Sequence, residues 1–148
     1  MKIQTKFLGE MEISEDNLLT FTEGIPGFPN EKNFVLVPLN NVSPFLVLQS
    51  VTTKEVGFMV ATPYAFNPSY SFDLQQEDIE QLEVEQAEDV FVYGILTLKD
   101  KLSTSTINLL APIVINNKKK LAKQIVLTSE SEAILRYPLK KATEGSAK

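Results

Sequence analysis

The sequence predicts a mainly β protein, with a small antiparallel β-barrel-like or sandwich fold and one or two short helices. Short apolar runs rich in β-branched and aromatic residues recur at near-regular spacing along the 148 residues. Turn residues separate these runs, as is typical of all-β sandwiches and barrels. One segment alone has apolar residues at helical spacing, and we find no internal repeat. We therefore expect a single domain over residues 1–139 and a small, polar, flexible tail over residues 140–148.

The turn residues indicate how the expected strands are connected. Gly9 breaks the alternating first segment into a hairpin, and residues 52–55 form a four-residue hairpin connection. Gly94 indicates a bulge or kink in a long strand, and Pro112 confines its segment to a sheet edge or a bulge. In chain order, the expected strand segments are residues 1–13, 17–21, 34–39, 44–51, 56–63, 89–98, 106–116 and 123–129.

The exceptional segment is "FDLQQEDIEQLEV", residues 72–84. Asp73 is placed as an N-cap with Gln76 three residues later, and Ile79 and Leu82 follow at helical spacing. We expect a short amphipathic helix there. The two prolines within residues 62–70 predict a loop before it.

Missing residue types restrict the chemistry. The chain has no histidine and no cysteine, and Arg136 is its single arginine. Catalytic triads, Cys–His pairs, imidazole bases and most zinc sites are thereby excluded. A carboxylate pair remains conceivable for an enzyme, but no spacing singles one out. We expect no enzyme activity, no cofactor and no metal. No apolar run has the roughly 20 residues of a membrane helix, and the N-terminal residues do not form a signal peptide, so a cytoplasmic protein is expected.

An acidic run is the most conspicuous charge feature. The formal net charge is −5, and residues 73–89 contain eight carboxylates and no lysine or arginine. Such a run is either a solvated helix face or a surface for a basic partner. It lacks the spacing of a calcium loop. The lysines of residues 116–124 are not interleaved with aromatic residues, so a solvent-exposed hairpin is expected there, and direct nucleic-acid binding is not.

The stretch "GIPGF", residues 24–28, has two glycines but is not a phosphate loop. Pro26 removes a backbone donor, no lysine motif follows, and the next segment has the pattern of a strand. A type II-like turn explains it better, since Pro26 fixes φ at the second position and Gly27 supplies a positive φ at the third. Phe28 is then directed at the core or at a partner.

An ordered set of blocks resembles the FliW family of flagellar assembly factors. The blocks are "GIPGF", "FLVLQSV" (45–51), "FDL" (72–74), "NLLAPIVIN" (108–116), "KQIVL" (123–127) and "YPL" (137–139). The resemblance implies an antiparallel β-barrel-like fold. It also implies a non-enzymatic regulator that binds either flagellin or the RNA-binding translational repressor CsrA, and that relieves repression of flagellin synthesis by capturing CsrA.

The resemblance gives the acidic run and the turn a use in partner binding. The carboxylates can pair with the basic surface of an RNA-binding protein. The rigid turn and the strand edge can provide apolar contacts with a partner. The alternative function is an OB-like β-barrel that binds single-stranded RNA or a small ligand. The residues predicted to contact partners are Asp73, Glu77, Asp78, Glu80, Glu83, Ile25, Pro26, Phe28, Asn108 and Pro112.

Overall fold

The structure is a computed structural model that describes residues 1–39, 44–101, 104–127 and 137–139. The predicted tail, residues 140–148, and the last two residues of the predicted strand 123–129 lie outside the described residues. Within the described ranges, no helix has the length and apolar character needed to cross a membrane.

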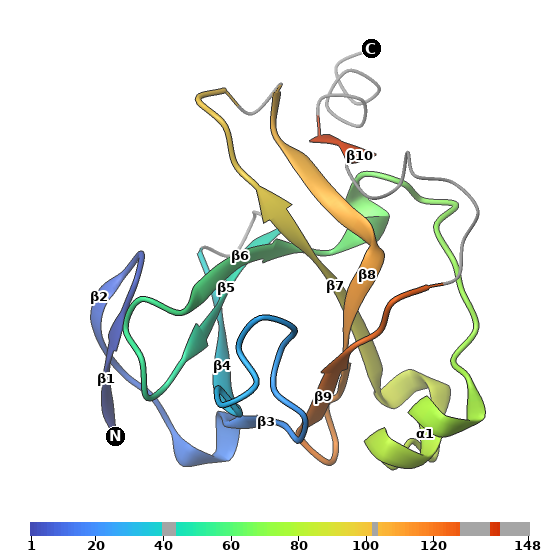
Figure 1. Cartoon of the computed structure of the whole chain (residues 1–148), viewed down its shortest axis with the longest axis horizontal. Coiled ribbons are helices and arrows are strands. Elements are labelled where there is room, and N and C mark those ends of the chain that lie inside the picture. The colour runs from blue at the N-terminus through green and yellow to red at the C-terminus, as the bar shows by residue number, and fades with distance from the viewer. Residues whose placement is uncertain (40–43, 102–103, 128–136, 140–148) are drawn as a thin grey trace.

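An eight-stranded sheet closes on itself and forms a barrel (Figure 1). The closure occurs because β8 pairs with β7 on one side and with β9 on the other, while β9 also pairs with β3. The fold is therefore a barrel and not an open sandwich. The strands of the ring are β3 (Leu19–Phe21), β4 (Asn33–Pro38), β5 (Phe45–Ser50), β6 (Gly57–Ala61), β7 (Val90–Thr97), β8 (Thr106–Asn116) and β9 (Leu121–Gln124). The short β10 (Tyr137–Pro138) pairs with the start of β8.

The predicted hairpins are confirmed. β4, β5 and β6 form an antiparallel meander, and the register pairs Phe45 with Ala61 and Gln49 with Gly57. The first segment forms β1 (Lys2–Thr5) and β2 (Gly9–Glu12), which pair only with each other as a separate two-stranded sheet. The few residues of the connecting turn are enough to specify such hairpins.

One pairing was not expected from the sequence. β3 and β9 run parallel, with Thr20 opposite Leu121, and the Thr20 N–H donates to the carbonyl of Lys120 at 2.9 Å. These strands are about 100 residues apart in the chain. This parallel pair closes a barrel whose other neighbouring strands are antiparallel.

The predicted irregularity at Gly94 is confirmed. The register between β7 and β8 shifts between Tyr93 and Ile95. A Cβ atom at Gly94 would lie 2.6 Å from Cγ1 of Ile107, so only glycine allows β8 to cross so closely.

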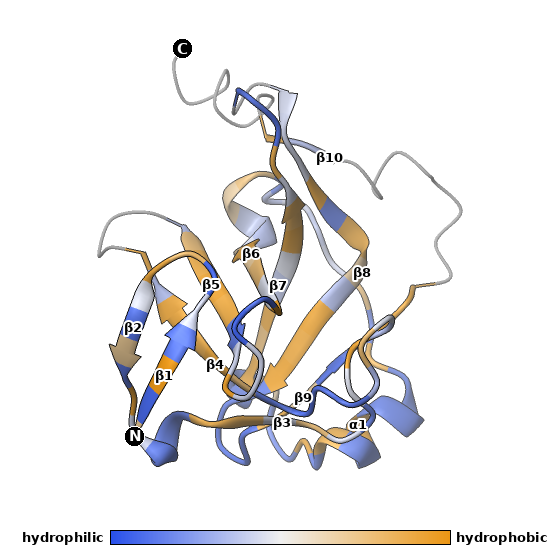
Figure 2. Cartoon of the chain, turned by 60° about the vertical axis from the view of Figure 1, so that its left-hand side comes forward, coloured by the Kyte–Doolittle hydropathy of each residue, from blue (hydrophilic) through white to orange (hydrophobic). Residues whose placement is uncertain are grey.

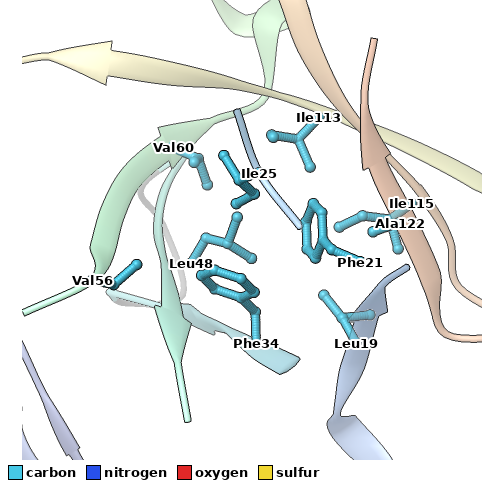
Figure 3. Packing of buried hydrophobic residues seen from close by; sticks show 10 residues of the cluster. All are labelled: Leu19, Phe21, Ile25, Phe34, Leu48, Val56, Val60, Ile113, Ile115 and Ala122. Carbon is cyan, nitrogen blue, oxygen red and sulfur yellow. The ribbon is translucent and has the colours of Figure 1, made fainter. Parts of the chain in front are cut away.

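The barrel interior is filled by apolar side chains (Figure 3). Phe21 and Phe34 are fully buried and meet edge to face, with their ring centroids 5.1 Å apart. Ile25, from the turn between β3 and β4, points into the centre of this cluster and is 2% exposed. The turn therefore acts as a plug, and apolar side chains pack the interior of the ring.

Within the described ranges, helical structure is confined to short segments. The α-helix that lies wholly within those ranges is α1 (Gln76–Leu82). Three single-turn 3-10 helices also lie wholly within the described residues: η1 (Glu15–Asn17), η2 (Pro63–Ala65) and η3 (Ala87–Asp89). In Figure 1, α1 lies outside the barrel beside β9.

Candidate protein-interaction surfaces

The helix α1 begins two residues later than the sequence indicated, with Gln75 at the N-cap position in place of Asp73. The backbone N–H of Gln75 donates to Asp78 Oδ2 at 3.3 Å, so Asp78 occupies the third helical position of a capping box. Asp73 is exposed and is not the N-cap, which corrects the prediction. Phe72 and Leu74 explain the delay, because both pack against buried residues beside the helix and hold the chain outside it.

Asn116 connects the other end of α1 to the barrel. The Asn116 side-chain amide donates to the carbonyls of Leu82 at 2.8 Å and Glu83 at 3.1 Å. The Asn116 Oδ1 accepts from the backbone N–H groups of Lys118 and Lys119 in the β8–β9 turn. One buried side chain therefore satisfies both the last carbonyls of the helix and the turn.

An ion pair fixes α1 against β9. Lys123 Nζ lies 2.8 Å from Asp78 Oδ1, and the two side chains are 19% and 10% exposed. Lys123 also donates to the Gln81 side chain. Asp78 was predicted to contact a partner; the structure has its carboxylate largely buried and paired with Lys123, where it stabilises the packing of α1 on β9.

Four of the other carboxylates of the run lie on or next to the helix and form an acidic α1 surface, which we define as Asp73, Glu77, Glu80 and Glu83. All four residues are exposed, and none makes an ion pair with another described residue. Farther along, Glu85 lies 3.5 Å from Lys118 Nζ in an exposed pair, which is worth little in water. Figure 2 shows α1 as strongly hydrophilic. The acidic α1 surface therefore carries negative charge that no ion pair within the described part of the chain balances.

The "GIPGF" stretch forms the predicted type of turn. Gly27 has φ +89°, and Ile25 and Phe28 exchange backbone hydrogen bonds across the turn. Gly24, at φ +70°, is also required, because a Cβ there would lie 2.6 Å from the Pro29 carbonyl oxygen. Ile25 is buried as the barrel plug, so Pro26 and Phe28 are the predicted contact residues that the turn exposes.

Phe28 is part of an exposed apolar area that we call the Phe28 patch, defined as Phe7, Phe28, Phe58 and Leu98. Phe28 is 40% exposed, and its ring meets Phe58 edge-on at a centroid distance of 5.7 Å. The four residues line one groove of about 290 Å³ between the β1–β2 turn, β6 and β7. Exposed apolar groups gathered in this way are typical of contact surfaces.

Asn108 and Pro112 lie in the irregular middle of β8, apart from both surfaces. Asn108 Oδ1 accepts the N–H groups of Leu110 and Ala111, each at 3.0 Å. Pro112 is buried. The edge interpretation of Pro112 is wrong, since β8 is paired on both sides, and the bulge interpretation agrees with the register shift opposite Gly94. These residues bend the strand and offer little surface to a partner.

Two polar networks in the structure were not predicted from the sequence. The fully buried Gln49 accepts the Lys6 N–H at 2.9 Å and donates to carbonyls of the β5–β6 turn, including Lys54 at 3.1 Å. Glu31 accepts hydroxyl hydrogen bonds from Ser50 at 2.6 Å and from Thr53 at 2.7 Å.

Both networks hold the β5–β6 turn. The hydrogen bond from Ser50, followed by that from Thr53, lowers the pKa of the Glu31 carboxyl below its ordinary value. The contacts of Glu31 with Ser50 and Thr53 make it a turn-stabilising group. Throughout the described ranges, no three His, Cys, Asp or Glu side chains come together as a metal site.

Comparison with known proteins gives a consistent result. Residues 2–139 match the family model described as FliW protein. The chain is 50% identical over 131 residues to the flagellar assembly factor FliW of Bacillus licheniformis, covering 88% of this chain and 92% of that protein. It is 46% identical to the Bacillus subtilis protein of the same description, with the same coverage. A crystal structure of the flagellar assembly factor FliW superposes with a TM-score of 0.87 at 43% identity, covering 94% of this chain and 96% of that chain.

Proposed function

This chain belongs to the FliW family of flagellar assembly factors, and on that premise we propose that it is a non-enzymatic regulator with two alternative protein partners. In the proposal it works in the cytoplasm, where it captures the RNA-binding repressor CsrA and thereby relieves repression of flagellin synthesis. Flagellin is the competing partner, so that export of flagellin frees the regulator.

The observation that carries the proposal is the acidic α1 surface. Four exposed carboxylates lie around one short helix, and none has a countercharge among the described residues. A protein that binds RNA presents cations, which the acidic α1 surface complements. Negative charge brought close to the RNA path weakens phosphate binding. Release of RNA requires only that the regulator bind RNA-free CsrA more tightly than RNA-bound CsrA.

The Phe28 patch supports the proposal because a partner can also make apolar contacts there. It supplies an apolar contact area on a rigid turn, where little conformational entropy is lost on binding. Its residues come from the β3–β4 turn, the β1–β2 turn, β6 and the chain just after β7, which are different from the elements that carry the acidic α1 surface.

Calorimetric titration with purified CsrA tests the proposal. The decisive variant is Glu77→Gln/Glu80→Gln/Glu83→Gln, and the matched control is Glu15→Gln/Asp16→Asn/Glu23→Gln, which removes three exposed charges elsewhere. At about 0.2–1 kcal/mol per exposed charge pair, we expect affinity to fall about threefold to hundredfold in the first variant and to change little in the control. The difference should shrink at about 0.15 M salt, where the screening length is about 8 Å.

The outcomes separate the alternatives. Equal affinity of the two variants for CsrA would show that CsrA binds away from α1. Wild-type protein that binds neither CsrA nor flagellin would overturn the proposal. Retention on single-stranded RNA without CsrA would favour the OB-like alternative.

A further inference from the structure

The chain beyond β9 has an open edge. The N–H groups of Ile125 and Leu127 donate to the carbonyls of Pro112 and Leu110 in β8, at 2.9 and 2.8 Å. In an extended strand, neighbouring residues direct their backbone groups to opposite sides, so Val126 directs its own away from β8. Among the described residues, the Val126 N–H and C=O have no hydrogen-bond partner, and Val126 is 66% exposed. The sheet therefore extends past Gln124 with one side unpaired.

A second unpaired segment lines the same groove. The α1–β9 groove has a volume of about 810 Å³ and is lined by residues 69–73, 75, 77 and 78 on one side and residues 123–127 on the other. The backbone groups of residues 71–74 make no hydrogen bonds with other described residues. In Figure 1 this segment descends to α1 on the side of the barrel where the chain leaves β9. Two stretches of open backbone thus border one groove.

The base of the α1–β9 groove is apolar. Phe72 and Leu127 line it and pack against a buried cluster that contains Ile125, which also lines it. Its rim is acidic, since Asp73 and Glu77 line the groove and are exposed. The one lysine in the lining, Lys123, is paired with Asp78 and does not offset that charge.

These features select the conformation and charge of an occupant. A helix satisfies its own backbone hydrogen bonds, so it would leave the backbone groups of the groove unpaired. An added strand pairs with an open edge through main-chain bonds, and its alternate side chains point to opposite faces. One set of side chains would then meet Phe72 and Leu127, while Lys or Arg on the other face would meet the acidic rim.

We propose that the α1–β9 groove binds an extended, basic segment of a protein partner by strand addition at Val126. The inference rests on the proposed function, because it states how a basic partner such as CsrA is held. It extends that function from a charged surface to a backbone-specific site.

Two variants of the full chain test the strand addition by titration with CsrA. Val126→Pro removes the outward N–H, whereas Val126→Thr keeps it together with the β-branched shape. Because the Val126 N–H has no partner within the described structure, Val126→Pro breaks no described hydrogen bond. We expect Val126→Pro to weaken binding about tenfold or more, with Val126→Thr close to wild type.

Hydrogen exchange of the wild-type complex provides a second measurement that does not depend on a variant. The amide of Val126 and amides within residues 71–74 should exchange quickly in the free protein and slowly in the complex. Unchanged exchange at Val126 in a complex that does form, or equal affinity of the two variants, would overturn strand addition and leave the proposed function standing.

Other occupants are distinguishable. Slow exchange at Val126 in the free protein would overturn the proposal, because the groove would then be filled by this chain itself or, if the protection rises with concentration, by a second copy. Failure of wild-type protein to bind either CsrA or flagellin would remove the proposed function, and the strand-addition inference would fall with it.

Discussion

The Asp78–Lys123 ion pair should hold α1 on the barrel, and a double-mutant cycle measures this contribution. The perturbations are Asp78→Asn, Lys123→Met and their combination. Asp78→Asn retains an oxygen that can accept the Gln75 N–H, so the helix cap is preserved while the charge is lost. Lys123→Met retains most of the apolar stem.

The magnitude follows from the geometry. The charged atoms are 2.8 Å apart, and the side chains are 10% and 19% exposed. Removing one partner of a fully buried pair costs about 3–5 kcal/mol. Because Lys123 retains some solvent contact, screening reduces our expectation to roughly 1.5–3 kcal/mol for each single variant. For a chain of this length, about 2–4 °C of melting temperature corresponds to each kcal/mol, so each variant should melt about 3–12 °C lower.

Urea unfolding of the four proteins supplies the coupling free energy. The double variant should be less destabilised than the sum of the single variants, by about 1–2 kcal/mol. The matched control is Glu85→Gln with Lys118→Met, whose side chains are 59% and 57% exposed at 3.5 Å, and whose coupling should stay below about 0.5 kcal/mol. Equal coupling in the two cycles would refute the assignment of Asp78 to the fold.

Three further predictions concern the turn and its neighbours. In denaturant unfolding, Gly24→Ala should lower the free energy of unfolding by at least about 1 kcal/mol more than Gly27→Ala does. Both positions have a positive φ, but only at Gly24 would the added Cβ lie 2.6 Å from a backbone carbonyl oxygen. Equal losses for the two variants would contradict this clash. Ile25→Ala should cost about 2–5 kcal/mol by the same measurement, since Ile25 fills the barrel centre, and a loss under about 1 kcal/mol would show that the plug is not tightly packed. The pKa of Glu31 is lowered in the folded state. Its contribution to the free energy of unfolding is therefore fully present above the ordinary carboxyl pKa and is lost as the pH falls through the folded-state pKa. The stability difference between wild type and Glu31→Gln should shrink on acidification, and a difference that does not change with pH would contradict the hydroxyl contacts.

Local chemistry explains why much of the fold could be predicted. Gly27 has a positive φ and Gly94 leaves no room for a Cβ atom beside Ile107, so glycine residues in the sequence indicated both the turn and the bulge. The connection between β5 and β6 was predictable for the same reason, because alternation and turn residues determine a hairpin over a few positions.

Contacts between distant segments explain what could not be predicted. The parallel pairing of β3 with β9 depends on barrel closure, which no local pattern encodes. The sequence indicated Asp73 as the N-cap of α1, whereas the structure has Gln75 there and Asp78 at the third helical position. This start of the helix depends on the packing of Phe72 and on Lys123, which lies 45 residues from Asp78. For the candidate surfaces, the sequence identified the acidic run but not which of its carboxylates are already neutralised.

The filled barrel determines where this protein can act. Small barrels either pack their interior with side chains or hold a ligand there, and here Ile25 from the "GIPGF" turn occupies the centre. The same turn exposes Pro26 and Phe28 on its other side. The packing of Ile25 in the barrel and the position of Phe28 on the surface are therefore set by one five-residue stretch. A substitution that loosens the plug should disturb the Phe28 patch, while the acidic α1 surface, held by Asp78 and Asn116, should keep its shape.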